Sequence, residues 1–454
     1  MELFEQITAS VSSFLWGWPM IILLLGTHIF LTIRLKFPQR KIFTAIRLSF
    51  KKDPDSEGDV SQFGALATSL AATIGTGNII GVATAVAFGG PGAVFWCWLT
   101  GVFGIATKYA EGLLAIKYRV KTSSGEMLGG PMYALERGLK QKWLGILFCI
   151  FTAMAAFGIG STVQANSIAL LMQETYGVSE HITGIVVALG IALVIFFGVK
   201  GIARVCMTLV PLMAILYIGG CIYILILNHV YLGEAFKLII SSAFTPHAAG
   251  GGFLGTSVML AARYGIARGL FSNESGLGSA PIVAAAAQTR NPVRQALVSS
   301  TGTFWDTVII CALTGLVLVT SVLAFPDIDY TQGGALTKAA FGKIPYVGTS
   351  ILAIGILTFA FSTILGWGYY SGKAIEYLGG KKLLRIYRVI WISSIYFGST
   401  MNLQAVWNIA DSVNALMAVP NLISLIFLSG VAVKETQKYL WENRLEDTAD
   451  PEDL

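Results

Sequence analysis

Long apolar stretches, separated by short polar ones, follow one another along most of this chain. A helix needs about 20 such residues to cross the hydrocarbon core of a bilayer. About eleven stretches reach that length, near residues 14–33, 63–90, 92–116, 144–174, 181–199, 203–228, 251–287, 296–324, 346–372, 384–400 and 405–432. The pattern therefore predicts an all-α integral membrane protein with about eleven transmembrane helices.

Two of these stretches contain residues that weaken a helix. The first holds "TIGTGN" at 73–78, and the second holds "RGLFSNESGLGSAP" at 268–281. Glycine destabilises a helix interior by up to about 1 kcal/mol relative to alanine, and polar side chains are costly in hydrocarbon. Both parent stretches are also longer than one straight crossing needs, so we expect each of these helices to be discontinuous.

The charges of the loops give an orientation. Basic residues gather in every second loop, at 34–52, 117–121, 200–204, 290–294 and 373–388. The loops 175–181 and 400–405 contain neither Lys nor Arg. Because cytoplasmic loops are enriched in Lys and Arg, we expect a multi-pass protein of the plasma (inner) membrane, with its N-terminus outside and its C-terminus in the cytoplasm.

Counted without the first apolar stretch, the two interrupted helices are spans 1 and 6 of ten, and the loop charges give them opposite directions. Two groups of five helices with opposite polarity form a 5+5 inverted repeat, as in LeuT-type secondary transporters. The expected parts are an extracellular N-terminus with an extra transmembrane helix (1–33), a basic cytoplasmic linker (34–62), two five-helix repeats (63–229 and 230–432) and a solvated cytoplasmic tail (433–454).

Broken helices indicate ligands, because an unpaired peptide group in lipid is costly. The N-terminal ends of half-helices attract a carboxylate, whereas their C-terminal ends and freed carbonyls suit a hard cation such as Na⁺. A small zwitterion carried together with a cation fits this arrangement. For the first break alone, the alternative is close helix packing through Gly77 and Gly81.

Composition excludes several other classes of protein. Hydrophobic residues make up 55% of the chain and charged residues 12%, which is too apolar for a soluble surface. The five cysteines have no metal-ligand spacing, and no HExxH, GxSxG or acid–histidine arrangement indicates an enzyme. The net charge of +6 is explained by the basic loops. We expect no catalysis, no nucleic-acid binding and no obligate protein partner.

The sequence also resembles one family over essentially its whole length. "GTGNIIGVATAVAFGGPGAVFWCWLTGVFGIATKYAEGLLAIKYR" at 75–119 resembles the signature region of the alanine or glycine:cation symporters (sodium:alanine symporters), within the amino acid-polyamine-organocation superfamily. "GLFSNESGLGSAP", "QALVSSTGTFWDT" and "FSTILGWGYYSGKAIEYL" resemble its later blocks. The resemblance implies Na⁺-coupled uptake of small neutral amino acids, alanine and/or glycine, by a LeuT-like core with one additional N-terminal helix.

For the first break, the resemblance implies the following roles. The backbone of Gly75, Thr76 and Gly77 would hold the substrate carboxylate. The side-chain amide of Asn78 would contribute to the same contact and to part of a cation shell.

A Na⁺ site is expected between spans 1 and 8. The carbonyls of Ala71 and Ile74 precede the break and suit a cation, and the hydroxyls of Ser362 and Thr363 are similar to the side-chain ligands of such a site. The alternative for the two hydroxyls is a hydrogen bond to a carbonyl one turn earlier. Na⁺ acts here as a coupling ion and not as a prosthetic group.

Span 3 carries an amide, Gln164, in an apolar helix, where it needs a polar partner. The partner is either the substrate, which the family resemblance favours, or Asn166 or Ser167 through a helix–helix hydrogen bond.

The remaining candidates lie in spans 6 and 8. Phe271 and Ser272 are expected at the second break, with Phe271 closing over the substrate side chain. Asn273 and Glu274 could equally cap the second half-helix. Trp367 follows Thr363 by four residues, on the same helix face, where it either limits the pocket or simply packs.

Arg268 and Asp411 are the two ionisable residues expected in the outer half of the membrane, as a possible outer gate. Two alternatives to Na⁺ symport stay open, namely coupling to protons and a receptor or channel that binds amino acids without coupled transport. Spans 1 and 8 offer no evident proton relay, which favours Na⁺.

Overall fold

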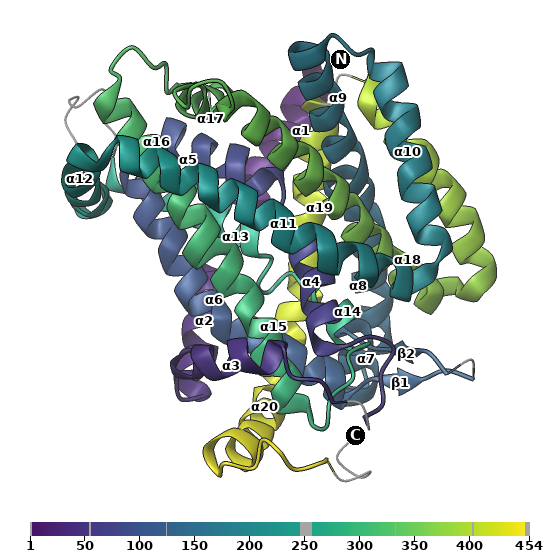
Figure 1. Ribbon diagram of the computed structural model, residues 1–454. Coiled ribbons are helices and arrows are strands. Elements are labelled where there is room, and N and C mark those ends of the chain that lie inside the picture. Colours follow the sequence, from purple (N-terminus) through teal and green to yellow (C-terminus); the bar gives the residue numbers. More distant parts are fainter. Residues whose placement is uncertain are drawn as a thin grey trace.

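The computed structural model describes residues 2–53, 56–123, 125–245, 257–331, 333–401 and 404–449. Figure 1 shows a bundle of helices with one small antiparallel hairpin, β1 (Val120–Lys121) and β2 (Met127–Leu128). The helices of the first half are α1 (Glu2–Leu15), α2 (Trp18–Arg34), α3 (Ile42–Ser49), α4 (Gln62–Thr73), α5 (Val82–Gly89), α6 (Gly92–Lys117), α7 (Pro131–Tyr133), α8 (Lys142–Ala155), α9 (Val163–Tyr176), α10 (Glu180–Phe196) and α11 (Gly198–Leu227).

The second half continues the helical bundle. Its helices are α12 (Leu232–Phe244), α13 (Val258–Asn273), α14 (Pro281–Ala284), α15 (Pro292–Thr303), α16 (Ala312–Ala324), α17 (Gly333–Gly342), α18 (Gly348–Thr400), α19 (Gln404–Phe427) and α20 (Ser429–Thr436). Several helices contain or continue into π-helical segments, at Gly77–Gly81, Ala134–Gly138, Ala156–Thr162, Phe304–Cys311 and Gln437–Trp441.

Helix α6 lies in the centre and packs against α2, α12, α13 and α15. Small residues let its neighbours approach closely. A Cβ atom added at Gly112 would lie 2.9 Å from the Cβ of Ser299, and one added at Gly104 would lie 3.3 Å from Thr303 on the same helix, α15. Such contacts supply helix packing in lipid, where hydrocarbon surrounds both partners and hydrophobic burial contributes little.

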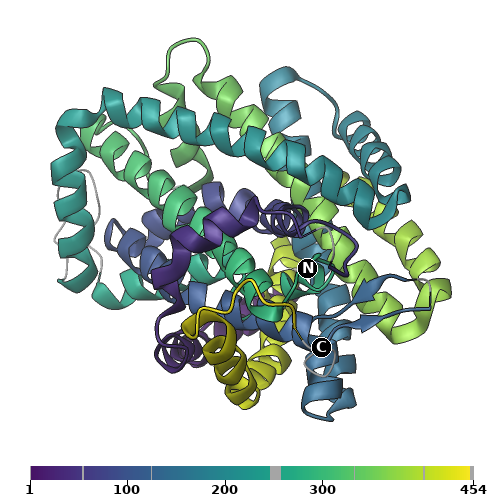
Figure 2. The same ribbon diagram turned by 60° about the horizontal axis from the view of Figure 1, so that its bottom comes forward.

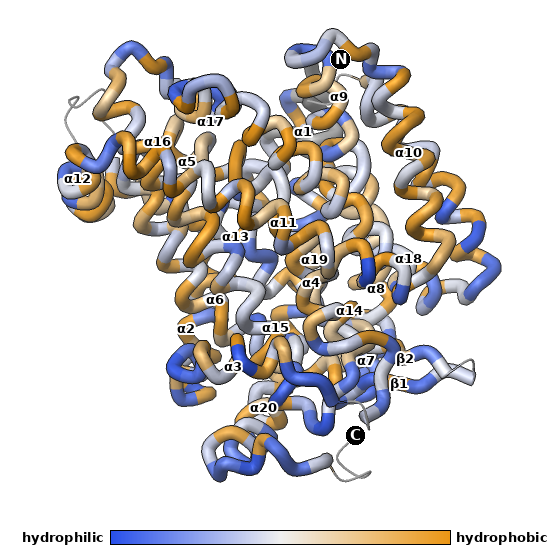
Figure 3. Tube along the Cα trace, viewed as in Figure 1, coloured by the Kyte–Doolittle hydropathy of each residue, from blue (hydrophilic) through white to orange (hydrophobic). Residues whose placement is uncertain are grey.

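The outer flanks of the bundle are apolar. Large side chains such as Leu189, Leu193 and Phe196 on α10 and Leu212 and Ile215 on α11 are more than half exposed. Figure 3 shows hydrophobic positions along the long helices, while hydrophilic ones gather at both ends, around α17 at the top and around α3, α20 and the hairpin at the bottom. By length and composition, five helices of the described residues can cross a membrane, or up to seven if each bent pair counts as one span. The structure thus supports a multi-pass membrane protein, and the count of eleven stays a prediction.

Helix α18 explains part of the difference in number. It runs from Gly348 to Thr400 and covers two predicted stretches, 346–372 and 384–400. Its only non-helical residue is Gly380, with φ 66° and ψ −166°, a conformation that glycine adopts readily. The chain therefore turns at Gly380, so α18 consists of two helical segments, one for each predicted stretch.

The first predicted break is confirmed. Helix α4 ends at Thr73, Ile74 is extended with ψ 96°, and helical structure resumes only at Gly77. The segments Gln62–Thr73 and Gly77–Gly89 meet at an angle of 53°.

The second break is also present, but it begins later than expected. Helix α13 continues through Phe271 and Ser272 and ends at Asn273. Glu274 then adopts a left-handed conformation with φ 53°, and the chain becomes helical again only at Pro281. Phe271 and Ser272 therefore form the last turn of a half-helix. The first residues of the predicted stretch 251–287 lie outside the described residues.

Most residues of 442–448 in the C-terminal tail are exposed, as expected of a solvated end, but the tail is also held against the bundle by hydrogen bonds. Asn291 donates hydrogen bonds to the carbonyls of Leu445 and Asp447, and the backbone N–H of Ala449 donates to Arg290. Figure 2, in which the bottom of Figure 1 comes forward, shows this yellow segment lying across that end of the molecule. The tail is held by backbone carbonyls, which a charge pattern does not reveal.

A buried ion pair joins the basic linker to the same region. The Arg294 Nε atom lies 2.9 Å from the Asp53 Oδ2 atom, and both side chains are fully buried. Arg294 also lies 3.1 Å from Glu446 of the tail. The linker, the start of α15 and the tail are thereby tied together.

We expect Asp53→Ala to lower the thermal unfolding temperature of the purified protein in detergent strongly. The substitution removes the fully buried partner of Arg294 and leaves only the exposed Glu446 carboxylate beside the guanidinium. Removing one partner of a buried pair costs about 3–5 kcal/mol. The matched control is Lys51→Ala, whose ion pair with Glu446 is about half exposed and worth about 0–1 kcal/mol. Equal shifts for the two variants would contradict this account.

Candidate functional site

The two breaks lie against each other and enclose a small central cavity. A Cβ atom added at Gly77 would lie 3.5 Å from the Phe271 ring and 3.9 Å from the Cα atom of Ser272. The cavity measures about 20 Å³, room for about one water molecule. Its lining residues are Ala72, Thr73, Gly75, Thr76, Gly77, Ile159, Gln164, Phe271, Ser272, Glu274, Thr363 and Asn414.

Most of the predicted substrate residues therefore meet at one place. Seven of them line the cavity, namely Gly75, Thr76, Gly77, Gln164, Phe271, Ser272 and Thr363. Asn78 and Trp367 do not, and both lie directly behind its wall. Direct contact of the nine residues with a substrate stays a prediction.

Asn78 bonds to the protein on both sides of its amide. Its Oδ1 atom accepts a hydrogen bond of 2.9 Å from the backbone N–H of Gly75, and its Nδ2 atom donates one of 2.7 Å to the carboxylate of Asp306. The first bond replaces a helical partner for Gly75. The second connects the break to a helix more than two hundred residues away.

Asp306 is a buried acid that the sequence analysis did not single out. It lies on the π-helical segment Phe304–Cys311 and accepts hydrogen bonds from Asn78, from Ser272 at 3.0 Å and from Thr307 at 2.6 Å. One carboxylate therefore contacts both interrupted helices. The available signal was an aspartate inside the apolar stretch 296–324, since ionisable residues in membrane helices are usually paired or functional.

The predicted ligands of the Na⁺ site also come together. In a continuous helix the Ala71 carbonyl would accept from the N–H of Gly75, but that N–H donates to Asn78 instead. The freed Ala71 carbonyl lies 3.2 Å from the Ser362 hydroxyl and 3.1 Å from the Thr363 hydroxyl. Because all three groups are oxygens, they are suited to a hard cation.

The alternative for these hydroxyls, a hydrogen bond to a carbonyl one turn earlier, is found for one of the two. Ser362 also donates to the carbonyl of Phe359 one turn earlier, at 2.9 Å, which is ordinary back-bonding in a helix. Within the described residues Thr363 forms no such bond, and a Cβ atom added at Gly75 would lie 2.8 Å from its hydroxyl. Ile74, the other predicted carbonyl ligand, is buried and has the extended backbone of the break.

Gln164 reaches the first break across the cavity. Its Oε1 atom lies 3.5 Å from the Thr76 hydroxyl, and its Nε2 atom donates to the Ile159 carbonyl at 3.0 Å. The proposed bond to Asn166 or Ser167 is wrong, because Asn166 donates to Gly398 and Met401 and Ser167 donates to Val163.

The unwound stretch of the second break is held by another buried acid, Glu111 of α6. Its Oε1 atom accepts hydrogen bonds from the backbone N–H groups of Gly276 and Gly278, at 3.0 and 3.1 Å, and from Asn421 at 2.7 Å. These bonds satisfy amides that have lost their helical partners. Lys108, one turn away on α6, is only 2% exposed.

Glu274 brings a carboxylate to the cavity itself. It accepts a hydrogen bond from Ser279, while Asn273 accepts one from the backbone N–H of Ser275. Both residues therefore stabilise the turn after α13. The predicted capping of the second half-helix is wrong, because α14 has Ala280 at its N-cap position and no side-chain cap hydrogen bond. Glu274 in addition lines the cavity, where its charge can attract an ammonium group.

Trp367 stands at the back of the site, fully buried. A Cβ atom added at Gly160 would collide with the Cβ atom and ring of Trp367, so only glycine leaves space for the indole there. The ring therefore packs against the segment Ala156–Thr162, whose Ile159 lines the cavity.

Arg268 and Asp411 line a second cavity of about 150 Å³, together with Trp16 of the segment between α1 and α2. Phe271 lines both this outer cavity and the central one, so its ring is part of the wall between them. The Trp16 indole donates a hydrogen bond of 2.8 Å to the Asp411 carbonyl, and its ring meets Phe271 edge to face at 6.4 Å. Arg268 and Asp411 both belong to the described residues, and their side chains do not form an ion pair with each other within 4 Å.

The sequence matches known proteins over nearly its whole length. Residues 1–452 match the model of the "Sodium:alanine symporter family". The chain is 51% identical to the sodium/alanine symporter AgcS of Methanococcus maripaludis, over 96% of this chain and 97% of that one. It is 36% identical to the probable sodium/glutamine symporter GlnT of Bacillus subtilis, over 96% and 91% of the two chains.

A solved structure shows the same fold. MhsT, crystallised with L-phenylalanine, superposes with a TM-score of 0.57 and 17% identity over 87% of this chain and 94% of that one. The architecture is thus that of LeuT-like transporters. The match over nearly the whole length, together with the two broken helices, shows that this chain is a sodium-coupled amino acid symporter and not an enzyme, and that it belongs to the sodium:alanine symporter family.

Proposed function

We propose that this protein takes up alanine and/or glycine together with Na⁺ by alternating access, as a LeuT-like 5+5 inverted repeat with one extra N-terminal helix. The observation that carries the proposal is the meeting of two unwound helices at one cavity, with peptide groups and a carboxylate around it. In this arrangement the half-helices move relative to the rest of the bundle and expose the site to each side in turn.

The groups around the cavity suit a small zwitterion, and the cavity, which has room for about one water molecule here, widens to admit it in the proposed cycle. The N–H groups near Gly75, Thr76 and Gly77 are the proposed partners of the substrate carboxylate, and the Glu274 carboxylate is the proposed partner of its ammonium group. Phe271 lines the small cavity and leaves little room for a substrate side chain. Alanine and glycine fit these limits better than glutamine, the substrate in the name of one relative.

The proposed Na⁺ site consists of the carbonyls of Ala71 and Ile74 and the hydroxyls of Ser362 and Thr363. The convergence of three of these oxygens supports it. Coupling to protons is a second candidate, which the cavity acid Glu274 and the nearby acid Asp306 favour. The location is the plasma (inner) membrane, with the N-terminus outside and the C-terminus in the cytoplasm, as the basic loops indicate.

Uptake of labelled alanine and glycine into proteoliposomes tests the function. We expect an imposed Na⁺ gradient to drive both, a proton gradient without Na⁺ to drive neither, and a tenfold excess of glutamine to compete poorly. Counterflow of alanine should also occur, since a receptor shows none. Proton-driven uptake without Na⁺ would refute Na⁺ coupling.

The variants Ser362→Ala and Thr363→Ala test the cation site. Each removes one oxygen ligand, and a hydrogen-bond-like contact to a charged group is worth about 1.5–3 kcal/mol. We therefore expect the Na⁺ concentration for half-maximal uptake to rise about tenfold or more, and the apparent alanine affinity at low Na⁺ to fall by linkage.

The matched control for the cation site is Thr358→Ala on the same helix. Its hydroxyl donates to the Ile354 carbonyl and lies away from Ala71. Its Na⁺ dependence should match that of the unmodified protein. If the Ser362 and Thr363 variants also kept that dependence, the site would lie elsewhere.

Charge reversal tests the proposed outer gate. Arg268 and Asp411 face one cavity, and we propose that they approach each other when it closes. We expect Arg268→Glu and Asp411→Arg each to reduce uptake at least about tenfold, because a like-charge or unpaired buried contact opposes closure. The double variant should recover much of the loss.

The control for the gate is Arg263→Glu, which also lines the outer cavity. Adding Asp411→Arg to it should rescue nothing. Failure of rescue in the Arg268 and Asp411 double variant would exclude a direct pair, and the N-terminal contact of Trp16 with Asp411 would then be the structural role of that residue.

A further inference from the structure

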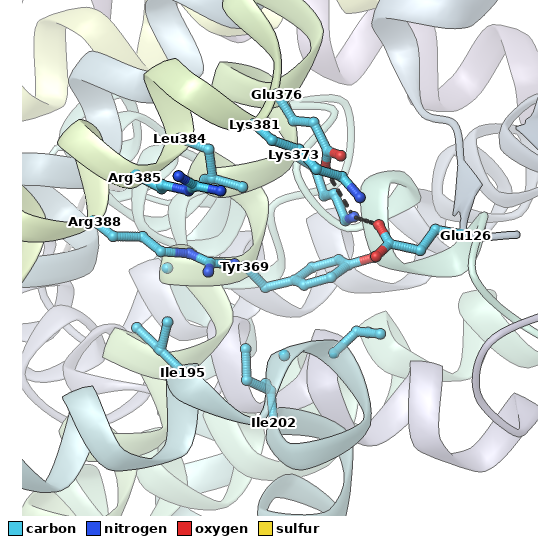
Figure 4. Close-up of a pocket in the computed structure, with 14 residues that line it drawn as sticks. Glu126, Ile195, Ile202, Tyr369, Lys373, Glu376, Lys381, Leu384, Arg385 and Arg388 are labelled. Carbon is cyan, nitrogen blue, oxygen red and sulfur yellow. Dashed lines mark hydrogen bonds and ion pairs between the residues drawn. The ribbon is translucent and has the colours of Figure 1, made fainter. Parts of the chain in front are cut away.

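A separate basic pocket lies at the end of the molecule that holds the hairpin and the turn of α18. It measures about 260 Å³ and lies between the junction of α10 and α11, the hairpin and the two segments of α18 around Gly380. Figure 4 shows its long side chains, with Arg385 and Arg388 on one side and Lys373, Glu126 and Glu376 on the other. It is distinct from the central cavity, with which it shares no lining residue.

The pocket carries an excess of positive charge. Its wall holds four cations, Lys373, Lys381, Arg385 and Arg388, and two acids, Glu126 and Glu376, for a formal balance of +2. Both acids are already engaged by Lys373, at 3.1 and 2.9 Å.

The guanidinium groups of Arg385 and Arg388 are the uncompensated part of this wall. Neither forms an ion pair within 4 Å with any residue that the structure describes. Both are exposed at the rim, three residues apart on one helix. Guanidinium groups on adjacent turns suit a phosphate, which they can bind through paired hydrogen bonds.

A buried hydroxyl provides a second indication of a ligand. Tyr369 lines the pocket and is only 5% exposed, yet its hydroxyl has no hydrogen-bond partner among the described residues. Its ring lies 5.9 Å from the Lys373 Nζ atom. Buried hydroxyls are almost always bonded, so a polar group entering the pocket would supply the partner that this one lacks.

The surroundings of the pocket are apolar and face outward. Phe196 and Phe197, at the turn between α10 and α11, are 84% and 65% exposed. Ile386 and Val389, next in sequence to the two arginines, are 60% and 66% exposed. A ligand in this position would contact cations with one end and exposed apolar side chains with the other. The position therefore suits an amphiphilic molecule, with one charged and one apolar end.

We propose that this pocket binds the phosphate headgroup of an anionic phospholipid, with Arg385 and Arg388 contacting the phosphate and the acyl chains lying along the exposed apolar side chains of α10 and α18. The basic loops place the pocket on the proposed cytoplasmic side. Basic pockets between helices on that side are known to recognise anionic headgroups. The proposal does not depend on which amino acid is transported.

The full-length purified protein, stripped of lipid in detergent, provides the test. Binding of phosphatidylglycerol and of phosphatidylcholine is measured by native mass spectrometry and by the shift in unfolding temperature. We expect phosphatidylglycerol to bind preferentially. The double variant Arg385→Gln/Arg388→Gln should weaken that binding about thirtyfold, from the usual contribution of two cations near an anionic headgroup.

Two controls separate the pocket from general charge. Arg47→Gln/Lys52→Gln removes two exposed cations from the basic linker, at the same end of the molecule, and should change the binding less than threefold. Arg385→Lys/Arg388→Lys keeps the charge but loses the paired hydrogen bonds of the guanidinium groups, so it should weaken binding, though less than the glutamine variant does. If the glutamine variant does not fold, Tyr369→Phe, which removes only the buried hydroxyl, should weaken binding severalfold.

Three outcomes would overturn the proposal. The first is equal binding of the two lipids, and the second is an equal loss of binding in the linker control. The third is saturable binding of inorganic phosphate or glycerol phosphate at concentrations that displace phosphatidylglycerol, which would assign the pocket to a soluble anion instead of a lipid. Transport activity is not part of the readout, so a failure here leaves the symport proposal untouched.

Discussion

The structure depends on one constraint, that peptide N–H and C=O groups inside a membrane must be bonded to something. Interrupting a helix at mid-depth releases several of them at once. In the first break, the Asn78 side chain accepts from Gly75, and the hydroxyls of Ser362 and Thr363 donate to the freed Ala71 carbonyl. In the second break, Glu111 accepts from the amides of Gly276 and Gly278. Each broken helix is therefore completed by side chains, either of its own residues, as with Asn78, or of neighbouring helices, as with Ser362, Thr363 and Glu111.

The side chains that complete the broken helices include ionisable groups, which therefore lie in the middle of the bundle. Glu111, Glu274 and Asp306 are all buried, and the buried Lys108 acts electrostatically on each of them. A buried charge is tolerated when it is hydrogen-bonded or paired. Asp306 and Glu111 each accept several hydrogen bonds. Three acids and one base therefore share the centre of the bundle.

The sequence was informative where a local pattern decides the structure. Three glycines and an asparagine in an apolar stretch were enough to locate the first break, because weak helix propensity and polar side chains act within a few residues. The second break was placed several residues too early. The glycines and polar residues of 268–281 mark the region, but the start depends on Glu274 adopting a left-handed backbone that the bonds of Asn273 and Ser279 support.

Long-range partners could not be predicted in the same way. Asp306 meets Asn78 across 228 positions, and Glu111 meets Gly276 across 165. Their pairing follows from how the helices pack, which a single sequence does not specify. The docked tail escaped prediction for the same reason, since Asn291 recognises the backbone carbonyls of Leu445 and Asp447 rather than their side chains.

The position of Phe271 has a kinetic consequence. Its ring contributes to the wall between the outer and the central cavity, so a single rotation about its side-chain bonds would open part of that wall. Rotations of this kind take picoseconds to nanoseconds in unhindered side chains, whereas collective movements of helices take microseconds to milliseconds. In the proposed transport cycle, passage of a ligand past Phe271 would therefore be fast, and the slower helix movements would set the turnover.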